Sequence, residues 1–298
     1  MKIELHHSPK PIPLDATKSS QANPAVSPKP VLDKKVSKQH SQKKIASWFS
    51  QVGIHNGYKN LNAPSLDEKV RLKEQIIARQ KVSNLESILG RALDLCLEDG
   101  KDESIDPDWF YSFVNMAEEI FSPTMQELWG RIFAVETAKP GSFSLKTLTV
   151  LKQLTQKDAQ IFRQAVNLTS YKKGESAPRL LIGCYQKSNI WSFFNTFNNK
   201  QLNLAEYGLS YPDLLSLMDL GLIHHSEIES GELSTSNQVE WRCAGSKIRI
   251  AAKKRGTTLL YYKFTTTGSE LCKLVSRQKR DAYTDAILTT LSRAFTIE

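Results

Sequence analysis

The chain has 298 residues, of which 40% are hydrophobic and 24% charged, and its formal net charge at pH 7 is +9. This length and composition suit one large or two modest globular domains, and they exclude a chain that is disordered throughout. There is no run of 18 apolar residues, and the N-terminus lacks the apolar core of a signal peptide. We therefore expect a cytoplasmic protein without membrane insertion.

The first 44 residues differ from the rest of the chain. They contain six of the twelve prolines and nine lysines against three acidic residues, and they contain no aromatic residue. Such a segment cannot bury enough apolar surface to offset the entropy of ordering, so we expect a disordered basic Pro/Lys-rich tail over residues 1–44. The tail contributes +6 of the net charge, which leaves a nearly neutral body. A basic arm of this kind can contact nucleic acid or an anionic membrane weakly, or it can serve as a linker or solubility feature.

Helical patterns dominate the next part. Apolar residues at helical spacing from Ile45 to Val52 indicate a linker or accessory helix over residues 45–63, and residues 64–172 are expected to form a helical domain. Ser65 and Glu68 have the spacing of a capping box. The long helix that follows is expected to bury one apolar stripe, consisting of Val82, Leu85, Ile88, Leu89, Leu93 and Cys96. Further helix starts are predicted at the N-cap residues Asp106, Ser122, Ser144 and Thr155.

The segment ELWGRIFAVETAKPGSFSLKTL contains a glutamate on an apolar helical stripe. Glu136 follows Trp129 by seven residues, close to the helix C-terminus, where the helix dipole disfavours a carboxylate. Its expected partners are free backbone N–H groups at the start of the next helix near Ser144, with Gly141 allowing the turn. We therefore interpret Trp129, Glu136, Gly141 and Ser144 as a structural corner between two antiparallel helices. A functional carboxylate is the alternative.

The character of the sequence changes after the polar stretch SYKKGESAP. RLLIGCY indicates a strand, LSYPDLLSLMDLGLI a helix that ends at Gly221, and TTTGSELCKLVS a capped helix. Between the two helices lie the strand patterns VEWRCAG, KIRIAAKKRG and TLLYYKF. Helix, short strand, long hairpin, strand and helix is the order of a winged-helix module. We expect a mainly α protein, α+β overall, with a winged-helix-like domain and a β-hairpin wing over residues 178–298.

Two resemblances rest on these motifs. LSLMDLGLIHHSE followed by YYKFTTTGSELCKL resembles the leucine-rich helix, GLI strand and LT-x-x-G-x-x-L pattern of bacterial winged-helix regulators. The segment DPDWF…MQELWGRIFAVETAKPGSFSLKTLTVLKQL, joined to that module, resembles a bacterial family catalogued as a domain of unknown function. The second resemblance covers residues from about 75 to 290. It implies the layout described above and no particular chemistry.

Nucleic-acid binding is one functional alternative. The expected recognition helix SYPDLLSLMDL contains no lysine or arginine and two aspartates, Asp213 and Asp219, so it is a poor reader of the major groove. The predicted hairpin is basic, however, and could contact phosphates without reading bases. Its candidate nucleic-acid-binding residues are Lys247, Arg249, Lys253, Lys254 and Arg255. The segment SRQKRDAY adds the cations Arg277, Lys279 and Arg280 after the last predicted helix.

A non-enzymatic regulatory or protein-interaction module is the reading that the sequence favours most. The aromatic segment NIWSFFNTF could form a surface for a protein partner or for self-association, since clustered aromatic side chains are typical of interface hot spots. Aromatic residues at this spacing also occur in buried cores. The sequence identifies neither the partner nor a small-molecule ligand.

Enzymatic activity is the least favoured alternative. The sequence contains no Walker loop, no G-x-G-x-x-G, no H-E-x-x-H and no G-x-S-x-G motif, and we expect no cofactor, no metal and no catalytic residue. The four cysteines are far apart and are expected to be reduced thiols. His224 and His225 are adjacent, so one is expected to face the core and the other the solvent. A site assembled from distant residues would leave no linear motif, and it stays open.

Overall fold

The computed structural model describes residues 32–55, 64–95, 104–187, 200–243, 246–278 and 280–298. Two compact units make up the chain, residues 1–73 and residues 74–298. The aromatic segment at residues 189–197, Cys96 and Lys279 lie outside the described residues. In the part that is described, no helix combines the length and the hydropathy needed to cross a membrane.

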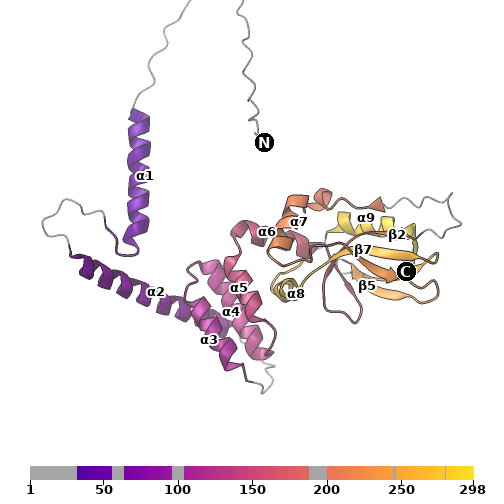
Figure 1. The fold of residues 1–298 in the computed structure, drawn as a ribbon, viewed down its shortest axis with the longest axis horizontal. Helices are drawn as coiled ribbons and strands as arrows, with labels where there is room; N and C mark the ends of the chain where they lie inside the picture. Colours follow the sequence, from indigo (N-terminus) through magenta and orange to yellow (C-terminus); the bar gives the residue numbers. More distant parts are fainter. Residues whose placement is uncertain (1–31, 56–63, 96–103, 188–199, 244–245, 279) are drawn as a thin grey trace, which may run out of the picture. The chain divides into compact units, whose positions relative to one another are not determined.

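Helix α1 (Leu32–Ser50) is the principal described element of the first unit (Figure 1). It begins inside the segment that was predicted to be a disordered tail, so that prediction is wrong for residues 32–44. Those residues contain no proline, whereas the six prolines of the tail all precede Leu32. Proline is the strongest helix breaker, so the average composition of residues 1–44 was misleading for residues 32–44, which can form a helix.

Helices also form the first part of the second unit. Most of α2 belongs to this unit, and its N-terminal capping box is present, because Ser65 and Glu68 each accept the other's backbone N–H. Asp106 caps the next helix through the N–H groups of Asp108 and Trp109. The helices in chain order are α2 (Leu66–Asp94), α3 (Pro107–Ala117), α4 (Pro123–Ala138), α5 (Leu145–Gln153) and α6 (Gln156–Asn167).

The buried face of α2 differs from the predicted stripe. Ile88 is buried as expected, but the other buried residues of α2 are Asn84 and Ala92, whereas Val82 and Leu89 are exposed. Asn84 can be buried because it is hydrogen-bonded: its Nδ2 donates to the backbone oxygen of Glu118, and its Oδ1 accepts from Gln126 Nε2. An apolar pattern ranks such a residue as surface, so the predicted stripe for α2 is wrong at these positions.

The remaining residues form one antiparallel sheet with three α-helices. In the described residues the sheet has eight strands in the order β4-β7-β2-β1-β5-β6-β8, with β3 paired to β2. The helices are α7 (Tyr211–Asp219), α8 (Thr266–Cys272) and α9 (Asp281–Ser292), and a short 3-10 helix covers Leu204–Tyr207. The strands are β1 (Thr169–Lys172), β2 (Arg179–Gln186), β3 (Lys200–Gln201), β4 (Ile228–Glu232), β5 (Val239–Cys243), β6 (Ser246–Ala252), β7 (Thr257–Lys263) and β8 (Phe295–Ile297).

The sheet is larger than the predicted wing. An α+β fold with its helices concentrated in the N-terminal part is confirmed, and the long hairpin is present as β5 and β6. Strand β7 does not pair with β6, however, although residues 253–256 connect them directly, because β2, β1 and β5 lie between the two in the sheet. Because residues 253–256 alone connect β6 to β7, the sheet must curl to bring these two strands close together. The GLI segment forms only an isolated bridge between Ile223 and Phe264, and the winged-helix assignment stays a prediction.

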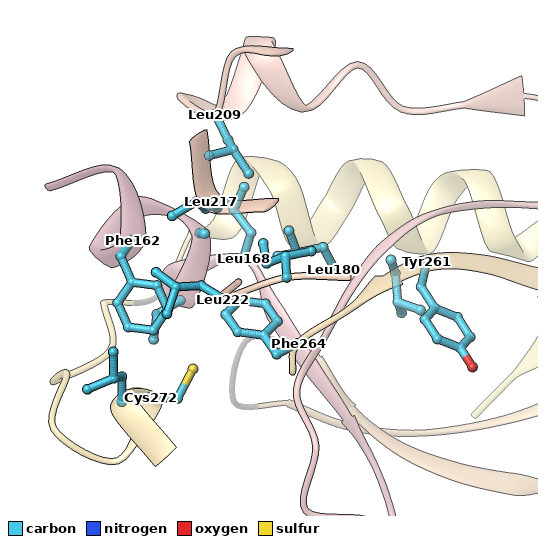
Figure 2. Packing of buried hydrophobic residues seen from close by; sticks show 14 of the residues in the cluster. Phe162, Leu168, Leu180, Leu209, Leu217, Leu222, Tyr261, Phe264 and Cys272 are labelled. Atoms are coloured by element: carbon cyan, nitrogen blue, oxygen red, sulfur yellow. The ribbon is translucent and has the colours of Figure 1, made fainter. Parts of the chain in front are cut away.

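One continuous hydrophobic core joins the helices of the second unit to the sheet. Figure 2 shows Phe162 of α6, Leu222 and Phe264 side by side, with Cys272 of α8 next to them. The rings of Phe162 and Phe264 are 6.0 Å apart between centroids. On another part of the sheet, α9 lies along β2 (Figure 1), where the Tyr283 hydroxyl donates to the backbone oxygen of Leu181 at 2.7 Å. The core therefore fixes the sheet that carries the site described next.

Candidate nucleic-acid interface

The five predicted cations are all exposed, but they do not form one group. Lys247 and Arg249 alternate along β6 with the buried residues Ile248 and Ile250, so they share the solvent-facing side of the strand. Lys253, Lys254 and Arg255 come after the end of β6, in its connection to β7. At about 3.3 Å per strand residue, Lys254 is roughly 20 Å along the chain from Lys247.

Of the three cations in the connection between β6 and β7, Lys253 has a local structural role, and the contacts show none for Lys254 and Arg255. Lys253 Nζ donates to the backbone oxygen of Ser292 at 2.6 Å, near the C-terminus of α9, where a positive charge is favoured by the helix dipole. Lys254 and Arg255 are exposed, and their side chains take part in no ion pair with the described residues. We therefore do not count Lys253, Lys254 and Arg255 in the same candidate site as Lys247.

The neighbouring strands bring other side chains next to Lys247. In the ladder, Tyr171 of β1 is opposite Arg242 of β5, and Arg242 is opposite Lys247 of β6. Directly opposed residues of an antiparallel sheet lie on the same face, so these three side chains form one row across three strands. Lys173, just after β1, donates from Nζ to Glu240 Oε2 of β5 at 2.9 Å and so lies next to this row of side chains. The sequence patterns do not predict Tyr171, Lys173 or Arg242 as binding residues.

Arg277 completes the group from a distant part of the sequence. Its guanidinium carbon lies 4.3 Å from the centroid of the Tyr171 ring, and its Nη2 donates to the Tyr171 hydroxyl. The segment that carries it follows α8 and is held by Asn167, whose Oδ1 accepts the backbone N–H of Gln278 at 2.8 Å. Asn167 is buried at the end of α6, so a core residue determines where Arg277 sits.

These side chains surround a shallow hollow of about 260 Å³. We call the group that consists of Tyr171, Lys173, Glu240, Arg242, Lys247 and Arg277 the basic face. It has four cations and one carboxylate, and Arg249 lies at its margin opposite Glu240. The pKa of Glu240 is lowered, first by the hydrogen bond from Lys173 and then by the charges of Lys173, Lys247 and Arg249. The carboxylate is therefore ionised at neutral pH, and a net positive charge remains around the hollow.

Three of the four residues of the predicted corner, Glu136, Gly141 and Ser144, lie at the turn between α4 and α5. Glu136 is only 3% exposed, and its two carboxylate oxygens accept the backbone N–H groups of Gly141 and Phe143 at 2.6 and 2.9 Å. Gly141 has a φ of 77°, in the left-handed region that glycine adopts without strain. Trp129 is fully buried, and Ser144 caps α5 by accepting the N–H of Thr147. These bonds account for the buried carboxylate without a ligand.

The other chemically reactive side chains do not converge. His224 and His225 are both exposed, so the prediction that one of them faces the core is wrong. Cys184, Cys243 and Cys272 are buried free thiols, and burial raises their pKa. Within the described ranges, no three His, Cys, Asp or Glu side chains are placed to hold a metal ion.

A second cavity of about 590 Å³ is lined mostly by apolar side chains of α4, α5, α6 and α8, among them Leu128, Phe162 and Leu271. Its rim includes the hydroxyl side chains of Ser122, Thr124 and Thr155. It contains no charged residue, so it lacks the means to orient a charged ligand. For a charged ligand, the basic face is therefore the better candidate site.

The comparisons with known proteins identify the family of the chain and assign no activity to it. No curated protein and no solved structure matches the chain. One family model matches residues 68–288, which include α2 almost from its start, helices α3 to α8, every strand of the sheet except β8, and most of α9. The basic face lies entirely within this range. The chain belongs to the family described as "Protein of unknown function (DUF2806)".

Proposed function

We propose that the chain binds nucleic acid through the basic face, mainly by contacts with phosphates and with little dependence on base sequence. The observation that carries the proposal is the convergence of Lys173, Arg242, Lys247 and Arg277 around one hollow, from two strands, the turn after β1 and the segment after α8. Side chains of lysine and arginine are the usual phosphate ligands, and grouping them focuses their charge. A cytoplasmic location, where nucleic acid is accessible, is part of the proposal.

The proposal does not require a helix in the major groove. Helix α7 is the expected recognition helix, and its sequence YPDLLSLMD contains no lysine or arginine. The cations belong instead to the sheet and to the segment after α8. Backbone contacts of this kind give binding that depends strongly on salt concentration and weakly on sequence.

Charge reversal in two matched pairs tests the proposal. The variant Arg242→Glu with Lys247→Glu removes two cations of the basic face, and the variant Lys254→Glu with Arg255→Glu makes the same change in charge outside it. We expect the first variant to weaken binding to a fluorescently labelled oligonucleotide by about tenfold or more and to flatten the salt dependence. The second should alter affinity by less than about threefold, through long-range charge alone. Equal effects of the two variants would count against the basic face.

Protein interaction is a second candidate, because helix α1 has exposed aromatic side chains. Trp48 and Phe49 are 64% and 56% exposed, and Ile45 is exposed beside them. Exposed aromatic residues at helical spacing are typical of helices that bind a protein surface. Light scattering of the purified chain over a range of concentrations tests self-association. A mass that stays at one chain, in the wild type and in Trp48→Ser with Phe49→Ser alike, would argue against it.

A further inference from the structure

The pair of Tyr171 and Arg277 gives the basic face a feature that phosphate binding alone does not need. The Arg277 guanidinium lies over the Tyr171 ring at 4.3 Å and is hydrogen-bonded to its hydroxyl, so the ring and the bond together hold the guanidinium in place. A cation that only attracts phosphates can stay flexible and fully hydrated. Here the guanidinium is held in contact with an aromatic ring while it still lines the hollow and is exposed to solvent.

A guanidinium that rests on an aromatic ring offers a flat surface for a nucleobase. The guanidinium is planar and weakly hydrated, and nucleobases stack on arginine planes as they do on aromatic rings. Tyr171 holds the guanidinium from one side, through its ring and its hydroxyl. A base that entered the hollow could stack on the face of the guanidinium that Tyr171 leaves open. Lysine could not serve in this way, because its ammonium group has no plane.

Such a stack requires a base whose face is free. In a duplex the faces of the bases are covered by their neighbours, and only base edges are accessible in the grooves. A single strand can turn a base out and place it flat against a side chain. The flanking cations Lys173, Arg242 and Lys247 are then in position for the phosphates on either side of the stacked base.

The charge pattern of the basic face also suits a single strand better than a duplex. Glu240 is ionised and lies among the cations, next to Lys173 and opposite Arg249. A carboxylate there interrupts a continuous phosphate path of the kind that a rigid duplex backbone presents. A flexible strand can pass its phosphates along the cations and keep them away from Glu240.

We propose that the ligand of the basic face is single-stranded nucleic acid, with one base stacked on the Arg277 guanidinium where it rests on Tyr171. This inference rests on the proposed function and names its ligand class. Asn167 acts as a positioning residue in it, since its bond to the Gln278 N–H fixes the segment that carries Arg277.

The first part of the test uses substitutions that keep the charge. Arg277→Lys retains a cation but removes the planar group, and Arg255→Lys is the matched control in the connection between β6 and β7. The probe is a single-stranded oligonucleotide that contains 2-aminopurine, whose fluorescence changes when the base stacks. We expect Arg277→Lys to weaken binding about tenfold and to abolish the fluorescence change, since one stacked base contributes a factor of this order. The salt dependence should be unchanged because the charge is unchanged.

A second variant guards against a simple loss of folding. Tyr171→Leu removes the ring beneath the guanidinium and keeps an apolar strand residue, and it should reduce the fluorescence change as Arg277→Lys does. Thermal unfolding followed by circular dichroism confirms that each variant is folded. If both folded variants gave the fluorescence change and the affinity of the wild type, the stacking proposal would be overturned.

The second part of the test compares three ligands with the full-length protein. The single strand should bind at least about tenfold more tightly than a duplex of the same length and sequence, and more tightly than adenosine monophosphate. Equal or tighter duplex binding would overturn the single-strand inference and leave the proposed function intact. Competition by the mononucleotide at the same nucleotide concentration would also overturn it, because the ligand would then be a free nucleotide. Failure of every nucleic acid to bind would overturn the proposed function itself.

Discussion

At the scale of single residues, burial decides which polar groups need partners. Glu136 could be located from the sequence because it lies on the same helical stripe as Trp129, and its need for N–H donors followed from elementary electrostatics. The structure supplies these donors from the turn, at Gly141 and Phe143. What the sequence could not supply was the particular donors, because they depend on the path of the chain through the turn.

Replacement of Glu136 tests this account of the corner. Glu136→Ala leaves two backbone N–H groups without their acceptor in a buried place, so we expect the free energy of unfolding to fall by about 3 kcal/mol. Glu127→Ala is the control, because Glu127 is an exposed residue of the same helix and its loss should cost no more than about 0.5 kcal/mol. Urea unfolding of the two variants measures both values. A loss at Glu136 as small as that at Glu127 would show that the carboxylate does not stabilise the turn.

The buried cysteines make stability depend on alkaline pH. Burial raises the pKa of Cys184 and Cys243 from 9.0 to about 11, and that of Cys272 to about 12. Above pH 9 the unfolded chain therefore loses protons that the folded chain keeps, which favours unfolding. The stabilising contribution is complete below pH 9 and is lost as the pH rises through the folded-state values.

We expect the free energy of unfolding to fall between pH 9 and pH 11 by about 1 kcal/mol per pH unit for each of these thiols. Urea unfolding at a series of pH values measures the slope. The variant in which Cys184, Cys243 and Cys272 are all alanine should have a clearly smaller slope, whatever its stability at pH 7. An identical slope in this variant would mean that other groups control the alkaline transition.

At the scale of helices and strands, local signals and long-range pairing differ in how well they can be predicted. The helix starts at Ser65, Asp106, Ser144 and Thr155 follow from cap residues, which act within one turn. Ser122 occupies the predicted N-cap position of α4, but its side chain makes no capping hydrogen bond. The order of the strands does not follow from local patterns, because neighbours in the sheet are far apart in the sequence. The stretch SYKK looked like a boundary, yet it begins the sheet as β1 between β2 and β5.

The basic face shows why this limit affects function. Lys247 and Arg249 could be selected because they lie close together in a basic run. Tyr171, Arg242 and Arg277 are separated by tens of residues, and only the pairing of β1 with β5 and the packing after α8 bring them together. The alternation of Arg242 with the buried residues Trp241 and Cys243 was a usable signal for an outward-facing cation. It did not indicate which strand lies beside it.

The crossing of α2 and α4 depends on one glycine. A methyl group at Gly130 would lie 2.8 Å from Arg91 Cβ and 3.1 Å from the Ala92 nitrogen, so the two helices approach each other too closely for any side chain there. Gly90 of α2, in contrast, has no atom within 4 Å of the corresponding position. We therefore expect substitution of glycine by alanine to change the free energy of unfolding in opposite directions at these two positions.

Gly130→Ala should lower the free energy of unfolding by about 1 to 3 kcal/mol, because the helices must separate to admit the methyl group. Gly90→Ala should raise it by about 0.5 to 1 kcal/mol, because alanine loses less conformational entropy in a helix than glycine does. Thermal unfolding of both variants gives the comparison. Two changes of the same sign would contradict the close approach of α2 and α4.

At the scale of the whole molecule, the distribution of charge is more informative than its sum. The first 44 residues contribute +6 of the net charge of +9, so the basic isoelectric point of the chain mainly reflects its N-terminal segment. The body is nearly neutral, yet four of its cations meet on the basic face. Binding by the N-terminal segment and binding by the basic face would both weaken with salt, so salt dependence cannot distinguish them.

Mapping of the contacts distinguishes them directly. The full-length protein, bound to a single-stranded oligonucleotide, is cross-linked by ultraviolet light and digested, and the modified peptides are identified by mass spectrometry. We predict that the cross-linked peptides include those that contain Tyr171 or Arg277, and that Arg242→Glu with Lys247→Glu removes these cross-links while Lys254→Glu with Arg255→Glu does not. Cross-links confined to residues 1–44 would contradict the assignment of nucleic-acid binding to the basic face.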